Sequence, residues 1–105
     1  MSNIELVEKE LSAAKLKHPK FCDRATYLEH FSRFRWAQLV ANQRAQNELS
    51  ENSGCLSAHS ILIEKLFEAL GQHALGNYQA ARVEFAQVAA VAIRAMEMCE
   101  REAAK

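Results

Sequence analysis

Two long helical patterns that meet at Gly76 and Asn77 constrain the fold of this chain more than any other feature. The run ILIEKLFEAL precedes this pair of residues, and ARVEFAQVAAVAIRAME follows it. Glycine suits the left-handed backbone at the end of a helix, and asparagine is a frequent cap at the start of the next. We therefore predict helices over residues 57–75 and 77–101. Because the turn between them is short, the two helices should pack antiparallel.

The N-terminus has the signals of a further helix. Ser2 followed three residues later by Glu5 matches a capping box. Apolar residues then recur at helical spacing until Pro19, which disfavours helical backbone at the residue before it. The first helix is therefore predicted over residues 3–17.

A second helix is predicted over residues 24–47, with a polar loop over residues 48–54 after it. Its larger apolar stripe consists of Tyr27, Leu28, Phe31, Phe34 and Ala41. Trp36 and Val40 lie roughly on the opposite side of the helical wheel. Two interpretations stay open. The helix is half-wrapped by its own domain, or Trp36 and Val40 form a second contact face for self-association.

Composition narrows the class of protein. The chain has 13 basic and 13 acidic residues, which argues against nucleic acid or a membrane surface as a partner. No run approaches the roughly 20 apolar residues of a membrane-spanning helix, and no secretory signal precedes the first helix. Three cysteines without metal-ligand spacing fit reduced thiols in a cytoplasmic protein. We predict one all-α domain over residues 1–105, with a four-helix, bundle-like fold.

Glu84 is predicted to point into the interface between helices. Small and aliphatic residues lie within about 80° of it on the helical wheel, namely Ala80, Ala81, Val88, Val91, Ala92 and Ala95. Burying an unpaired carboxylate costs several kcal/mol or forces its protonation. An inward Glu84 therefore needs a metal ion, a base or a hydrogen-bonding neighbour.

Glu64 and Glu68 lie one turn apart on the helix predicted over residues 57–75, with Lys65 beside them. One interpretation is a solvated acidic face, because the opposite arc holds the apolar residues Leu62, Ile63, Leu66, Leu70 and Ala74. The alternative is that the acidic side lines a cleft shared with the next helix or with another subunit. Clusters of carboxylate oxygens suit Mg²⁺ or Mn²⁺.

The pattern E-K-L-F-E at residues 64–68, followed by E-F-A-Q at residues 84–87, resembles the helical pair of MazG-like proteins. These proteins belong to the all-α nucleoside triphosphate pyrophosphatase superfamily, which carries E-E-x-x-E on one helix and E-x-x-D on the next. The resemblance is strongest over residues 57–99. The run QVAAVAIR is similar to a phage-type branch in which glutamine often replaces the aspartate, which suggests a mobile-element origin by analogy.

The resemblance implies a site for Mg²⁺ or Mn²⁺ with Glu64, Glu68 and Glu84 as ligands. In the family, these ions serve cleavage of a nucleotide between its α- and β-phosphates, and the proteins assemble as dimers or tetramers. Two acidic positions of the family pattern are replaced here, by Lys65 and Gln87. Both replacements are candidate substrate-binding residues, and their loss of negative charge puts two-metal chemistry in doubt.

Three functions are compatible with these residues. The first is a helical module that has lost full catalytic function and binds a small, nucleotide-like molecule or a protein. The second is a Mg²⁺-dependent nucleoside triphosphate pyrophosphohydrolase that uses the remaining carboxylates. The third is an unrelated bundle in which Glu84 pairs with an arginine, such as Arg33 or Arg35. In each case we predict a homodimer or larger homo-oligomer, with interface residues Trp36, Val40, Val88 and Val91.

Overall fold

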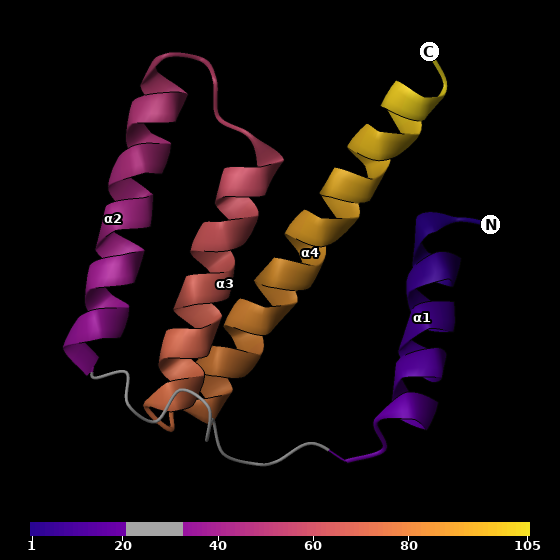
Figure 1. Cartoon of the computed structure of the whole chain (residues 1–105), viewed down its shortest axis with the longest axis horizontal. Helices are drawn as coiled ribbons and strands as arrows, with labels where there is room; N and C mark the ends of the chain where they lie inside the picture. Colours follow the sequence, from indigo (N-terminus) through magenta and orange to yellow (C-terminus); the bar gives the residue numbers. More distant parts are fainter. Residues whose placement is uncertain (21–32) are drawn as a thin grey trace.

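The computed structural model describes residues 1–20 and 33–105, and these residues form four helices and no strand (Figure 1). The helices are α1 (Asn3–Lys17), α2 (Arg33–Asn52), α3 (Ala58–Ala74) and α4 (Tyr78–Ala103). The protein is therefore all-α with a four-helix, bundle-like fold, as predicted. The first helix has the predicted bounds, and the last two differ from prediction by one or two residues at each end.

Ser2 and Gly76 act as the predicted helix signals, and Ser57 is a further N-cap that the sequence analysis did not name. Ser2 Oγ accepts a hydrogen bond of 3.1 Å from the backbone N–H of Glu5, and Ser57 Oγ accepts one of 3.2 Å from Ser60. Gly76 has a φ of +80° and ends α3 in a Schellman motif, because its own N–H donates to the carbonyl of His73. In the same motif the backbone N–H of Asn77 donates to the carbonyl of Gln72.

Asn77 is at the N-cap position of α4, but its side chain does not cap the helix. Its Nδ2 atom instead donates to Oε1 of Gln72, at 2.9 Å. The side chain is thus directed back along α3 and ties the turn to the helix that precedes it. The prediction of the position was right, and the prediction of the side-chain role was wrong.

The polar loop predicted over residues 48–54 is mostly helical, because α2 continues to Asn52. No proline or glycine interrupts this stretch before Gly54, so the helix runs on until Gly54 adopts a φ of +74°. The backbone N–H of Cys55 then donates to the carbonyl of Ser50 at 2.8 Å, which closes a second Schellman motif. The predicted start of this helix at residue 24 lies outside the described residues.

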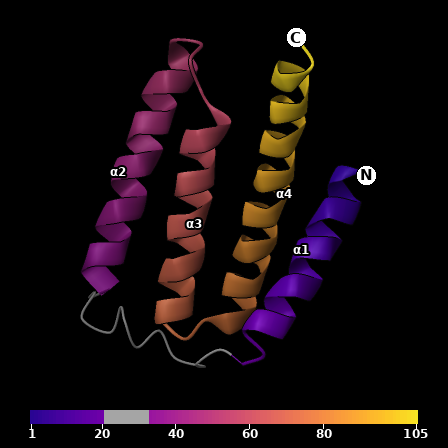
Figure 2. The ribbon, with the colours of Figure 1, turned by 45° about the vertical axis from the view of Figure 1, so that its right-hand side comes forward.

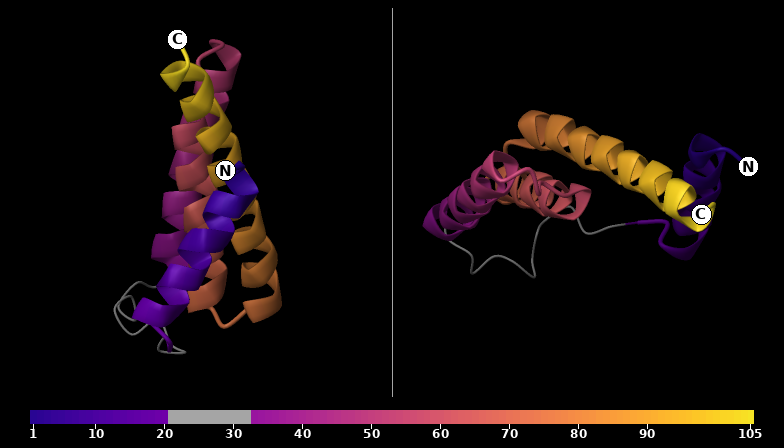
Figure 3. Two further views of the ribbon diagram at one scale, coloured as in Figure 1. Left: turned by 90° about the vertical axis from the view of Figure 1, so that its right-hand side faces the viewer. Right: turned by 90° about the horizontal axis from the view of Figure 1, so that it is seen from above.

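The four helices lie side by side in the order α2, α3, α4 and α1 (Figures 1 and 2). The antiparallel α3–α4 pair makes the most extensive contact, α2 covers the other side of α3, and α1 packs on α4. The molecule is consequently flat, with principal extents of 45, 43 and 20 Å, as the view from above shows (Figure 3). A row of helices leaves two broad faces open, whereas a closed bundle would cover them.

The core is small and consists mainly of compact residues. Among the described side chains, Trp36, Ala69 and Ala81 are the buried apolar ones, and Gly71 is buried beside them. A Cβ atom on Gly71 would lie 3.5 Å from the Cβ of Trp36, so α2 and α3 approach closely at this point.

The side of α2 that faces its own domain is the one with Trp36 and Val40, and not the larger apolar stripe. Trp36 is only 5% exposed, whereas Phe34 of the larger stripe is 75% exposed and Ala41 is also exposed. Three further residues of that stripe, Tyr27, Leu28 and Phe31, lie outside the described residues. Within the described part of α2, the inward face is therefore chosen by the fit of one tryptophan against Gly71.

Candidate functional site

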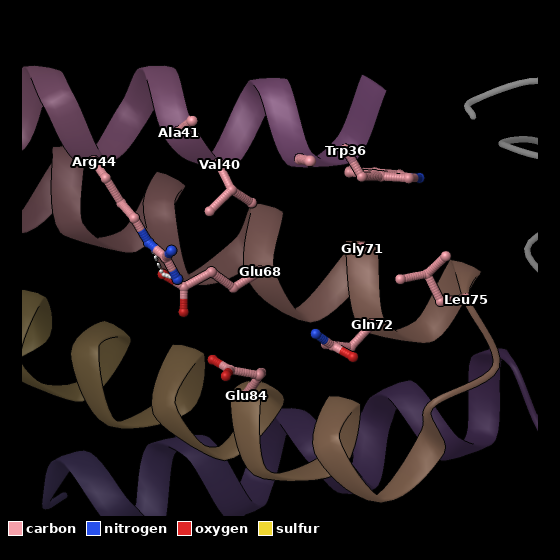
Figure 4. Close-up of a pocket in the computed structure, with 10 residues that line it drawn as sticks. Trp36, Val40, Ala41, Arg44, Glu68, Gly71, Gln72, Leu75 and Glu84 are labelled. Carbon is pink, nitrogen blue, oxygen red and sulfur yellow. Dashed lines mark hydrogen bonds and ion pairs between the residues drawn. The ribbon is translucent and has the colours of Figure 1, made fainter. Parts of the chain in front are cut away.

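A pocket of about 300 Å³ opens between α2, α3 and α4 (Figure 4). Apolar walls surround a small number of charged and polar side chains, which is the usual construction of a small-molecule site. The lining residues are Trp36, Ala37, Val40, Ala41, Arg44, Glu68, Gly71, Gln72, Leu75 and Glu84. Two of the three predicted metal-ligating carboxylates, Glu68 and Glu84, are therefore brought together in one pocket.

Glu68 is the central charged group of this pocket. It is 9% exposed, so the interpretation of a solvated acidic face does not apply to it. The Nη2 atom of Arg44 lies 3.2 Å from Oε1 of Glu68, and the Nζ atom of Lys65 lies 3.6 Å from its Oε2. Both carboxylate oxygens thus already face a cation from the protein itself, one from α2 and one from α3.

Glu84 points from α4 into the same pocket, toward Glu68 (Figure 4). Its Oε2 atom is buried and has no hydrogen-bond partner. The prediction of an inward carboxylate on α4 is therefore confirmed by the position of this side chain. The arginine that reaches the site, Arg44, pairs with Glu68 and leaves Oε2 of Glu84 unsatisfied. The side chain of Arg33 lies outside the described residues.

The pKa values of the two carboxyl groups move in opposite directions. Burial raises the pKa of Glu84, and the adjacent Glu68 raises it further through a hydrogen bond and its negative charge. Burial alone would also raise the pKa of Glu68, but the hydrogen bond with Glu84 lowers it. The charges of Lys65 and Arg44 lower it further, so the net pKa of Glu68 is below its ordinary value. Glu84 is consequently the member of the pair with the higher pKa.

The third predicted ligand, Glu64, belongs to a separate polar contact between α2 and α3. Asn47 is buried and donates from Nδ2 to Oε1 of Glu64 at 3.0 Å and to the carbonyl of Ser60 at 3.2 Å. The Nζ atom of Lys65 lies 3.8 Å from the other Glu64 oxygen. Lys65 therefore lies between Glu64 and Glu68 and partly neutralises both.

Gln87 and the predicted interface residues have different environments. Gln87 is exposed on α4 and does not line the pocket. Trp36 is buried within the chain, which leaves little of its surface for a partner. Val40, Val88 and Val91 are partly buried and retain some exposed surface. The predicted interface is thus available for three of its four residues.

Arg44 and Asn47 are site residues that the sequence analysis missed. Both lie on the side of α2 that carries Trp36 and Val40, because they follow Trp36 at the helical spacings of eight and eleven residues. Once that side is recognised as the inward one, the same periodicity places Arg44 and Asn47 against α3. The helical periodicity of α2 was visible in the sequence, but it did not show which face of α2 packs against α3.

Comparison with known proteins found no matching family model, no similar curated protein and no similar solved structure. The resemblance to MazG-like proteins therefore stays a prediction from the residues of α3 and α4. Within residues 1–20 and 33–105, no helix combines the length and apolar character that crossing a bilayer requires.

Proposed function

We propose that this protein is a non-catalytic, homo-oligomeric helical module that binds a small, nucleotide-like molecule between α2, α3 and α4. The observation that carries the proposal is the buried Oε2 atom of Glu84, which has no hydrogen-bond partner in a pocket of about 300 Å³. A buried acceptor without a partner is costly, and a ligand that donates a hydrogen bond would remove this cost. The pocket volume is at the lower end of small-molecule sites.

The polar groups of the pocket suit a ligand with a hydrogen-bond donor at one end and an anion at the other. An amino or ring N–H group, as in a nucleobase, would donate to Glu84. Arg44 is 61% exposed and binds Glu68 through Nε and Nη2, so further N–H donors of its guanidinium group can reach a phosphate. Val40 and Leu75 supply apolar surface between these two ends.

The alternative function is the Mg²⁺-dependent pyrophosphohydrolase that the family resemblance implies. The donor groups do not fit that metal well. Among the described residues, no group of three or more histidine, cysteine, aspartate or glutamate side chains lies close enough together to hold one ion. Glu64 and Glu68 face Lys65, and Glu68 also faces Arg44, so protein cations already compensate their charge. A divalent ion would have to displace these contacts, which favours the non-catalytic proposal.

The experiment is a calorimetric titration of the metal-free, full-length protein. The titrants are Mg²⁺ alone, Mn²⁺ alone, and a non-hydrolysable nucleoside triphosphate with and without metal. The proposal expects the nucleotide to bind without metal, and Glu84→Gln and Arg44→Gln each to weaken binding about tenfold, the effect of roughly 1.4 kcal/mol. Gln87→Ala is the matched control, because Gln87 is exposed on the same helix and outside the pocket.

Each alternative outcome has a distinct meaning. Binding that requires Mg²⁺ or Mn²⁺ and disappears in Glu84→Gln, together with release of pyrophosphate from a hydrolysable nucleotide, would replace the proposal by the pyrophosphohydrolase. Weaker binding in Gln87→Ala would move the site toward the exposed side of α4. If no titrant produces a binding heat, although circular dichroism shows that the protein is folded, the proposal of a nucleotide ligand is refuted.

A further inference from the structure

Within the described residues, helix α1 makes its main contact with α4 and has no buried residue. An isolated helix of 15 residues is marginally stable in water, so its position depends on what its apolar side chains contact. The side of α1 toward α4 includes Leu6, Val7 and Glu10, which line an apolar groove with Met96. Another part of α1 is not covered by this contact.

The uncovered part is a stripe of four residues, Ile4, Glu8, Leu11 and Lys15, which we call the α1 stripe. Their spacing of four, three and four residues places them on one side of the helix. Ile4 is 53% exposed and Leu11 is 52% exposed, although Leu11 also borders the groove. Two apolar side chains thus alternate with one acid and one base along an open helix face.

Glu8 and Lys15 have no ion-pair partner within the described part of the chain. They are seven residues apart, a rise of about 10.5 Å along the helix, which is too far for them to pair with each other. In a second copy of α1 that runs antiparallel, Lys15 would lie opposite Glu8, and Glu8 opposite Lys15. The same register places Leu11 within about one residue, or 1.5 Å, of Leu11 in the other copy.

We propose that two copies of this chain associate through their α1 stripes, packed antiparallel about a twofold axis. Such an interface is isologous, since each copy contributes the same residues and each charged residue meets its opposite. The inference deepens the proposed function, because it assigns a surface to the second copy that the proposed function invokes. It does not depend on the identity of the ligand.

The surface available around the stripe is compatible with a reversible dimer. A helix of 15 residues is about 22 Å long and one of 26 residues about 39 Å, and each is about 10 Å wide. The α1 stripe itself belongs to the shorter helix and offers roughly 220 Å² per copy, to which α4 adds only where it borders α1. Specific interfaces bury about 800 Å² per partner, with weaker ones below that value. We therefore expect a dimer that dissociates on dilution.

The test is sedimentation equilibrium of the full-length chain over a range of concentrations, with charge-reversal variants in the stripe. Glu8→Lys places like charges opposite each other at two symmetry-related positions, and Lys15→Glu does the same with the opposite sign. Each variant alone should raise the dimer dissociation constant roughly tenfold or more. An equimolar mixture of the two variants should restore association, because every contact across the axis again joins opposite charges.

Lys9→Glu is the matched control, because it makes the same charge change on α1 outside the stripe. It should leave the dissociation constant unchanged. A monomeric wild-type chain would overturn the proposal, and so would single variants that dimerise like the wild type or a mixture that fails to associate. A loss of association in Lys9→Glu equal to that in Lys15→Glu would also overturn it, since net charge and not the stripe would then control assembly. Nucleotide titration of the same variants reports separately on the ligand pocket.

Discussion

Replacement of Glu84 by glutamine should stabilise the protein near neutral pH. Glutamine keeps the shape of the side chain but removes the charge beside Glu68, and its amide can donate to the Glu68 carboxylate (Figure 4). In the wild type, the buried Oε2 atom of Glu84 has no partner, and its negative form is opposed by burial and by Glu68. Where Glu84 is ionised and has no proton to donate, the substitution therefore removes an unfavourable interaction and supplies a hydrogen-bond donor to the charged Glu68 carboxylate.

The magnitude follows from these two terms. An unsatisfied buried polar group costs about 1–3 kcal/mol, and a hydrogen bond to a charged group contributes about 1.5–3 kcal/mol. The two terms are not additive because they concern the same carboxyl group, so we expect a net gain of about 1–2 kcal/mol. For a domain of this size, that gain corresponds to an increase in Tm of roughly 5–10 °C.

The effect should depend on pH in a defined direction. The pKa of Glu84 is raised in the folded state, so protonation of this group stabilises the folded wild type fully at pH values below the unfolded-state pKa of about 4.3. That advantage is lost as pH rises through the folded-state pKa. The Tm difference between Glu84→Gln and wild type should therefore be largest near pH 7 and should shrink toward pH 4.

The assay is thermal unfolding followed by circular dichroism between pH 4 and pH 7, at one protein concentration. Glu97→Gln is the control, because it removes the same charge from an exposed position of α4. A lower Tm for Glu84→Gln at neutral pH would refute the reasoning and would indicate that the Glu84 carboxylate makes a stabilising contact. A Tm difference that does not change with pH would show that Glu84 and Glu68 do not share a proton.

Two further predictions concern the contact between α2 and α3. Asn47→Ala should lower the free energy of unfolding in urea by about 1–3 kcal/mol, because it leaves the acceptors on α3 without their buried donor, whereas Gln46→Ala on the exposed side should have little effect. Gly71→Ala should raise the free energy of unfolding by up to about 1 kcal/mol, because alanine removes the cost of glycine in a helix and its Cβ makes an ordinary contact with Trp36 at 3.5 Å. A loss of stability would mean that Trp36 cannot tolerate the methyl group.

Local features of the chain were predictable because they depend on neighbouring residues. Ser2 and Ser57 cap their helices through N–H groups three residues later, and Gly76 ends α3 because it accepts a positive φ. The inward direction of Glu84 was predictable for a similar reason. Its small neighbours on α4 form a single side that must pack against something. The all-α class, three of the four helix positions and one carboxylate of the site follow from such local patterns.

The sequence by itself therefore determined the all-α class, the bounds of α1, α3 and α4 to within two residues, and the inward direction of Glu84. Only the tertiary structure decided that α2 turns its Trp36 side to α3, and this choice brings Arg44 to Glu68 and Asn47 to Glu64. The wheel of α2 has apolar residues on two sides, so its period does not distinguish them. The inward side of α2 depends on contacts between residues that are far apart in the chain. Trp36 packs against the backbone of Gly71, which has no side chain, and polar side chains of α2 form hydrogen bonds and an ion pair with α3.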